Sequence, residues 1–138
     1  MSRNLIFNIF CLFIFLVVET VQAQRIETKQ VYFEKGTNGT TIDSNIKGYQ
    51  IIDYLLNARE GQLMNVSMAT DNSANYFNVM EPEEEYVAIY NGSMSETTNM
   101  FERELEKSGN YRIRVYLMRS AARRNEIANF KLEILITD

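Results

Sequence analysis

The clearest pattern of hydrophobic and polar positions lies near the end of the chain. Between Tyr111 and Met118, tyrosine, isoleucine, valine and leucine at odd positions alternate with two arginines, a tyrosine and a methionine. Between Ala128 and Ile136, the apolar residues fall at even positions and alternate with asparagine, lysine and glutamate. A period of two is typical of antiparallel strands with one buried face. Both segments are therefore predicted to be amphipathic β-strands.

The chain before these two strands divides into short segments, separated by glycines and Asn-Gly pairs that are typical of turns. Further strands are expected at residues 30–36, 41–48, 49–58, 63–69, 76–80, 86–90 and 100–105, with a short helix over 101–107 as the alternative to the last. Turns or loops are expected at residues 37–40, 59–62, 71–75 and 91–99. Short strands joined by turns predict an all-β domain, either a sandwich or a barrel.

The first 23 residues have a different character. A short positive start at Arg3 precedes a continuous apolar run from Leu5 to Val18, and a polar stretch then leads to Ala23. This order predicts a secretory signal peptide over residues 1–23, cleaved after Ala23. The apolar run falls short of the roughly 20 residues that span a bilayer, which disfavours the alternative of a membrane anchor. The remaining residues 24–138 have the size of a single domain, and no membrane attachment is expected after cleavage.

The distribution of cysteine and histidine narrows the function. The only cysteine, Cys11, lies within the expected signal peptide, and the chain has no histidine. Many exported animal proteins carry disulfides, so a cysteine-free exported domain fits the bacterial periplasm or the exterior of a bacterial cell better. Most nucleophilic relays and zinc sites use histidine or cysteine. We therefore expect no catalytic residues, no metal site and no cofactor, and the protein is predicted not to be an enzyme.

Charge gives a weaker indication of partners. Residues 24–138 contain 13 Lys and Arg against 17 Asp and Glu, a net charge of −4. This balance argues against nucleic acid, which needs a broad basic surface, and weakly favours a cationic protein partner. The acidic run from Glu81 to Glu85 lacks the glycine-punctuated pattern of a calcium loop. We expect it to be a solvated loop.

A second polar segment, "DNSANYF", offers side chains that could contact a glycan. These are Asn72, Asn75 and Tyr76. Segments rich in Asp, Asn and Ser are more often simple turns, because their side chains hydrogen-bond to nearby backbone. Both interpretations stay open from the sequence.

The arginines near the end of the chain fall into two groups. Arg112 and Arg114 lie on the polar face of the first amphipathic strand, where pairing with Lys131 and Glu133 across the last strand is expected. Three more arginines, at 119, 123 and 124, fall in the connection between the two strands. The first group is therefore interpreted as structural, whereas the second needs a separate explanation.

The connection itself has an unusual composition for a hairpin turn. Residues 120–123, "SAAR", contain neither glycine nor proline, which favours one helical turn. In such a turn the β-carbons of Arg119 and Arg123 lie about 5–6 Å apart on one side. Two guanidinium groups suit a carboxylate or phosphate, and the small alanines would keep the loop slim enough to enter a cleft. A solvated loop, with arginines paired to Glu126 or to the acidic run, explains the same spacing equally well.

Three long segments carry a family resemblance. "GYQIIDYLLNAREGQLMNV", "NYFNV" and "GNYRIRVYLMRSAARRNEIANFKLEI" resemble the periplasmic inhibitors of goose-type lysozyme. The resemblance covers nearly all of residues 24–138, and the last segment is the most specific. It implies a small antiparallel β-sandwich, exported by bacteria, that binds a muramidase by inserting a loop into its active-site cleft.

The resemblance also implies which residues bind. The binding arginines correspond to Arg119 and Arg123, and Tyr54 is expected on the same surface. Ser120 and Arg124 from the same stretch complete the expected contact set. The partner is then a lysozyme, itself cationic, and the oligomeric state stays open. The alternative function is a non-catalytic module of the cell envelope that binds a glycan or a protein.

Overall fold

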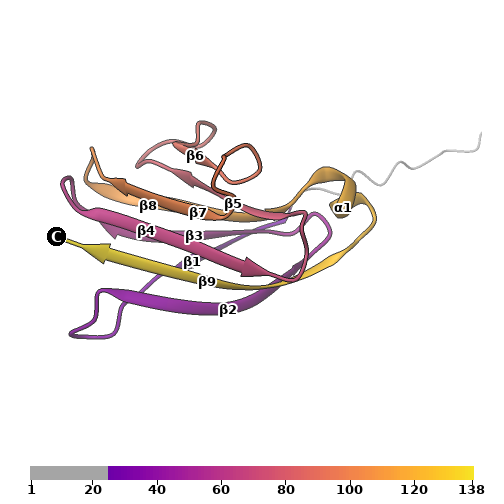
Figure 1. Cartoon of the computed structure of the whole chain (residues 1–138), viewed down its shortest axis with the longest axis horizontal. Helices are drawn as coiled ribbons and strands as arrows, with labels where there is room; N and C mark the ends of the chain where they lie inside the picture. Colours follow the sequence, from indigo (N-terminus) through magenta and orange to yellow (C-terminus); the bar gives the residue numbers. More distant parts are fainter. Residues whose placement is uncertain (1–24) are drawn as a thin grey trace, which may run out of the picture.

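The computed structural model describes residues 25–138, which form two β-sheets packed face to face (Figure 1). The signal peptide predicted at residues 1–23 lies outside the described residues. The five-stranded sheet has the order β1 (Ile26–Gln30), β3 (Ile51–Ala58), β8 (Gly109–Leu117), β5 (Asn75–Met80) and β6 (Tyr90–Asn91). The four-stranded sheet has the order β2 (Gly39–Lys47), β9 (Ile127–Thr137), β4 (Leu63–Thr70) and β7 (Met100–Glu104).

Strand pairing is antiparallel throughout, except that β1 runs parallel to β3 at the edge of the five-stranded sheet. One short helix, α1 (Arg119–Arg123), carries the chain from β8 to β9. The predicted all-β sandwich is therefore confirmed. Within residues 25–138, no helix is long and apolar enough to cross a membrane.

The core lies between the two sheets, and the alternation predicted for the last two strands creates much of it. From Tyr111 to Leu117 in β8, the odd positions are buried and the even positions are partly exposed. From Ala128 to Ile136 in β9, the even positions are buried and the odd positions are exposed. The largest fully buried side chains are Tyr54, Tyr111, Phe77, Ile46, Ile52, Met64, Ile113 and Leu132. Burial of apolar surface on this scale, at about 25 cal/mol per Å², is the main stabilising contribution to such a sandwich.

The two amphipathic strands do not pair with each other, which corrects one expectation. Strand β8 pairs with β3 and β5, whereas β9 pairs with β2 and β4 in the other sheet. The expected pairing of Arg112 and Arg114 with Lys131 and Glu133 is therefore wrong. Both strands need a partner layer for their apolar faces, and each finds it in the opposite sheet.

Two other predicted strands also need correction. The strand expected at residues 30–36 is instead β1 at Ile26–Gln30. All five side chains of β1 are exposed, so its sequence shows no alternation of buried apolar and exposed polar residues. The strand expected at residues 86–90 is reduced to β6 at Tyr90–Asn91, because Tyr86 (91% exposed) and Val87 (63%) have no layer to cover them. Strand β7 confirms the strand expected at residues 100–105, so the helical alternative there is wrong.

Candidate functional site

Helix α1 lies at one end of the sandwich, at the right of Figure 1. It confirms the helical turn predicted for residues 120–123. Ala121 and Ala122 are buried, at 0% and 3% exposure, and belong to the core. The alanines therefore anchor the turn to the sandwich, which corrects the expectation that they keep a protruding loop slim.

The predicted contact residues on α1 all face solvent. Arg119, Ser120 and Arg123 are exposed, as is Arg124 directly after the helix. Arg124 Nε donates a hydrogen bond to Glu126 Oε2 at 2.7 Å, and the Nη2 of Arg124 lies 2.6 Å from the same oxygen in an ion pair. Among residues 25–138, no ion pair includes Arg119 or Arg123. The expected pairing with Glu126 is therefore found for Arg124 and not for Arg119 or Arg123.

The arginines of β8 are bound to a buried carboxylate on the outer face of the five-stranded sheet. Arg114 donates to both oxygens of Asp53, from Nε at 2.8 Å and from Nη2 at 2.9 Å. Arg112 Nε lies 3.3 Å from Asp53 Oδ2. Asp53 is only 3% exposed, and its hydrogen bond to Arg114 raises the pKa of that guanidinium. These two arginines are structural, with Asp53 of β3 in place of the partner expected on β9.

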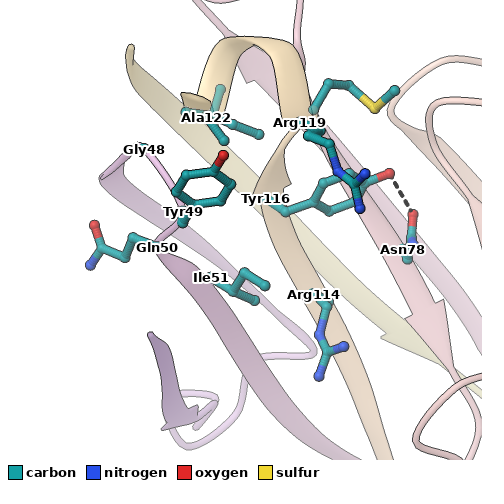
Figure 2. A pocket seen from close by; sticks show the side chains of 11 residues that line it. Gly48, Tyr49, Gln50, Ile51, Asn78, Arg114, Tyr116, Arg119 and Ala122 are labelled. Atoms are coloured by element: carbon teal, nitrogen blue, oxygen red, sulfur yellow. Dashed lines mark hydrogen bonds between the residues drawn. The ribbon is translucent and has the colours of Figure 1, made fainter. Parts of the chain in front are cut away.

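A hollow of about 390 Å³ opens beside α1, on the outer face of the same sheet (Figure 2). Its wall combines the turn between β2 and β3, strands β5 and β8, and the helix. The lining residues are Gly48, Tyr49, Gln50, Ile51, Asn78, Arg114, Tyr116, Leu117, Met118, Arg119 and Ala122. These include two arginines and two tyrosines but no carboxylate, so the hollow suits a neutral or anionic group.

Two tyrosines shape this hollow. The Tyr116 hydroxyl is close to Asn78 Oδ1, at 3.2 Å, and burial raises the pKa of Tyr116, so the hydroxyl stays protonated and donates (Figure 2). The Tyr49 ring stands at the opposite wall, with its hydroxyl toward Ala122 of α1. Sequence reasoning missed Tyr49, although it lies within the first segment that carries the family resemblance.

Tyr54 does not lie on this surface, which corrects its predicted role. It is 1% exposed and belongs to the core, because it shares the inward face of β3 with Ile52 and Leu56. Burial raises the pKa of its hydroxyl, which has no hydrogen-bond partner among the described residues. Near α1, the partly buried Tyr49 lines the hollow instead.

The asparagines proposed for glycan contact are used within the fold. Asn75 is fully buried, receives a hydrogen bond from the Thr70 hydroxyl at 2.8 Å and donates to the Tyr116 carbonyl at 3.0 Å. Asn72 donates to Glu126 Oε1 at 3.0 Å. Tyr76 is partly buried with its ring 6.4 Å from that of Tyr116. Glycan contact by the Asn75 side chain is therefore wrong, and Asn72 has an internal role.

The acidic run lies far from α1, beside the start of β8. Glu81 pairs with Lys107 at 3.7 Å, and a β-carbon on Gly109 would stand 2.8 Å from Pro82. Glu83, Glu84 and Glu85 share a hollow of about 220 Å³ with Arg112. Among residues 25–138, no group of three or more Asp, Glu, His or Cys side chains is arranged to hold a metal ion.

Comparison with known proteins decides the family. The chain is 33% identical to PliG of Aeromonas hydrophila, a periplasmic lysozyme inhibitor of g-type lysozyme. That structure matches 83% of this chain and 100% of its own, with a TM-score of 0.77. This chain belongs to the family of periplasmic inhibitors of g-type lysozyme. No protein-family profile matches it.

Two further relatives in the inhibitor family are more distant. PliG of Salmonella Typhimurium is 27% identical, covering 80% of this chain and 98% of its own, with a TM-score of 0.62. The inhibitor of g-type lysozyme from Escherichia coli K12 is 27% identical over 106 residues, which are 77% of this chain and 78% of that protein. Members of the family are inhibitors, which confirms the prediction of a non-catalytic protein.

Proposed function

We propose that this protein inhibits a g-type lysozyme in the bacterial periplasm by placing Arg119 and Arg123 in the active-site cleft of the enzyme. The observation that carries the proposal is the state of these two side chains. Both are exposed and without an ion-pair partner among residues 25–138, yet they stand on a helix whose alanines are buried in the core. A rigid mount reduces the conformational entropy that binding removes.

The chemistry of the target explains how such a contact inhibits. A muramidase cleaves its glycan with a carboxylic acid that must donate a proton to the leaving oxygen. An arginine beside that group favours the ionised form and lowers its pKa, so the acid no longer donates at neutral pH. The inhibitor also excludes the glycan from the cleft. Either effect stops cleavage, and one pair of arginines supplies both.

The remaining site residues have supporting roles in this proposal. Ser120 faces solvent between the two arginines and is placed to hydrogen-bond within the cleft. Tyr49 and Arg119 line the same hollow, so a part of the enzyme that contacts Arg119 also reaches Tyr49. Arg124 is held by Glu126 and contributes to the position of the helix end. The net charge of −4 favours approach of a cationic lysozyme.

Location follows from the same relationship. The signal peptide of residues 1–23 would direct export, and cleavage after Ala23 would release residues 24–138 into the periplasm. The relatives described as periplasmic support this location. Mass spectrometry of the exported protein, with a mature chain that begins at Gln24, is the expected result.

A titration tests the proposal. Residues 24–138 are titrated against g-type, chicken-type and invertebrate-type lysozymes, and we expect inhibition of the g-type enzyme. Arg119→Ala with Arg123→Ala should abolish inhibition without changing the thermal midpoint. The matched control, Arg59→Ala with Arg103→Ala, removes the same charge from exposed arginines on other parts of the molecule. It should leave inhibition close to that of the natural sequence.

Two outcomes would contradict the proposal. Absence of inhibition of all three lysozymes rules out the inhibitor function. Unfolding of the Arg119→Ala, Arg123→Ala variant would instead make the arginines structural. Binding to peptidoglycan fragments that is unaffected by this variant would support the alternative, a non-catalytic glycan-binding module.

A further inference from the structure

The loop between β4 and β5, residues 71–74, contacts both ends of α1. At the start of the helix, the Met118 amide donates to the Ala74 carbonyl at 2.9 Å. The side chain of Asn75, the first residue of β5, donates to the carbonyl of Tyr116, near the end of β8, at 3.0 Å. The last residues of β8 are therefore fixed to this loop before the helix begins.

At the other end of the helix, a single side chain makes the connection. Asn72 Nδ2 donates to Glu126 Oε1 at 3.0 Å and to the Ile127 carbonyl at 3.2 Å. Its own Oδ1 receives the amide of Ala74 at 3.0 Å. Asn72 thus joins the chain after α1 to the same residue, Ala74, that holds the chain before α1.

Neighbouring groups complete this arrangement. Glu126 uses its second oxygen, Oε2, to hold Arg124 at 2.7 Å, and its carbonyl receives the Gly48 amide at 2.9 Å. Asn125 has a positive φ of 57°, and its side chain leaves no room for a β-carbon on Gly48, which would come within 2.6 Å of Oδ1. Glu126, just after the helix, is therefore bound by Asn72, Arg124 and Gly48.

The helix needs external support because it is weak by itself. It has five residues, far below the roughly 12–15 at which isolated helices become stable in water. It has no side-chain hydrogen bond at its N-cap and no acidic residue in its first turn. The direction in which its exposed arginines point is therefore decided by tertiary contacts.

From this geometry we propose that Asn72 is a positioning residue for inhibition. Its side chain joins the two ends of α1 and keeps Arg119 and Arg123 in the orientation that enters the cleft. This inference rests on the proposed function. It also assigns Asn72 a role different from glycan contact, because both polar atoms of its amide already have partners within the protein.

The test exchanges the hydrogen-bond donor and acceptor between positions 72 and 126. Asn72→Asp keeps an acceptor for the Ala74 amide but replaces the donor that faces Glu126 with a like charge. If the helix then adopts the binding orientation one tenth of the time, inhibition of a g-type lysozyme weakens about tenfold. When Glu126→Gln is added to Asn72→Asp, the glutamine amide can donate to the aspartate carboxylate. The hydrogen bond between positions 72 and 126 is then restored with its direction reversed. The double variant should recover inhibition to within about threefold of the natural sequence.

The control carries the same substitution at a similar bond far from the helix. Asn57 Nδ2 donates to Asn110 Oδ1 at 3.1 Å, beside the start of β8. Asn57→Asp adds the same negative charge and removes an asparagine donor, so it should leave inhibition unchanged. Its comparison with Asn72→Asp removes any general effect of charge on the approach of the lysozyme.

A second readout does not depend on inhibition. Amide hydrogen exchange in the peptide covering residues 118–127 should be faster in Asn72→Asp and return to its original rate in the double variant. This result would support the positioning role even if no lysozyme were inhibited, so failure of the proposed function can be recognised separately. Unchanged inhibition in Asn72→Asp would overturn the positioning role, as would a double variant that stays as weak as Asn72→Asp.

Discussion

Two pairs of arginines lie within twelve residues of each other and have different surroundings. Arg112 and Arg114 are two residues apart on β8, partly buried against Asp53. Arg119 and Arg123 are four residues apart on α1, exposed and without an ion-pair partner among the described residues. Both pairs present their guanidinium groups on one side of a regular element. The first pair shares one buried carboxylate within the fold, whereas the second has no ion-pair partner among the described residues.

The difference shows what decides the role of an arginine. Burial of a carboxylate is costly unless it is paired and hydrogen-bonded, so Asp53, which is 3% exposed, keeps the arginines of β8 within the fold. No carboxylate lines the hollow beside α1, so nothing there neutralises Arg119. The charge of Arg119 is therefore available for a partner.

The largest expected effect is on stability, from removal of the buried carboxylate. Asp53→Ala leaves two partly buried guanidinium groups without a counter-charge, and the free energy of unfolding should fall by about 3 kcal/mol. Urea unfolding measures the change. The control is Asp43→Ala, which removes an exposed carboxylate 3.9 Å from Lys131 and should cost less than about 0.5 kcal/mol. Equal stability of the two variants would show that the β8 arginines do not need Asp53.

The next effect is on binding, from single truncation of the helix arginines. Arg119→Ala and Arg123→Ala should each weaken inhibition by about 2 kcal/mol, close to 30-fold, because each loses a charged contact that is desolvated in the cleft. Inhibition constants measure this loss. Neither variant should shift the urea midpoint, whereas Arg114→Ala should shift it because buried Asp53 loses both of its hydrogen bonds from Arg114. An equal shift of the urea midpoint in all three variants would show that the arginines of α1 contribute to stability as much as Arg114 does.

A smaller effect is expected when charge is kept but shape is lost. Arg119→Lys keeps one positive charge and removes the planar group that can donate two parallel hydrogen bonds to a carboxylate. Loss of one such bond should weaken inhibition by about 1 kcal/mol, near fivefold. Full inhibition by the lysine variant would mean that the cleft senses charge alone. Inhibition as weak as that of Arg119→Ala would mean that the paired geometry supplies the whole contribution.

The smallest effect concerns pH. Hydrogen bonds from Asn72 and then Arg124 hold the pKa of Glu126 below its ordinary value of 4.5. The folded protein therefore binds fewer protons at this site than the unfolded chain, so the contribution is present above pH 4.5 and is lost as the pH falls through the lowered pKa. The stability difference between the natural sequence and Glu126→Gln should shrink over that range. A difference independent of pH would exclude a role for the ionised carboxylate.

The elements with a strong local pattern were predictable from the sequence. Strands β8 and β9 follow from strict alternation, and α1 follows from a connection without glycine or proline. Strand β1 was misplaced because it pairs through its backbone at a sheet edge and buries none of its side chains. The short β6 was overextended for a related reason, since apolar residues at 86 and 87 look like a strand but have no layer to cover them.

The candidate site was only partly predictable. The exposed arginines of α1 were found, because the family resemblance and the helical spacing pointed to the same residues. Tyr54 was assigned to the surface and lies in the core, whereas Tyr49 was overlooked and lines the hollow beside α1. Nothing local indicated Tyr49, because its neighbours in the hollow come from β5, β8 and α1.

The sequence by itself determined which residues of β8 and β9 face the core, and that a basic helical turn separates these two strands. These properties depend on near neighbours, since alternation and turn chemistry act over a few residues. Only the tertiary structure decided that β8 and β9 lie in different sheets, that Asp53 pairs with Arg112 and Arg114, and that Asn72 contacts the chain after α1. These side-chain contacts join residues 54 to 61 positions apart, and such pairings are selected by the packing of the whole sandwich.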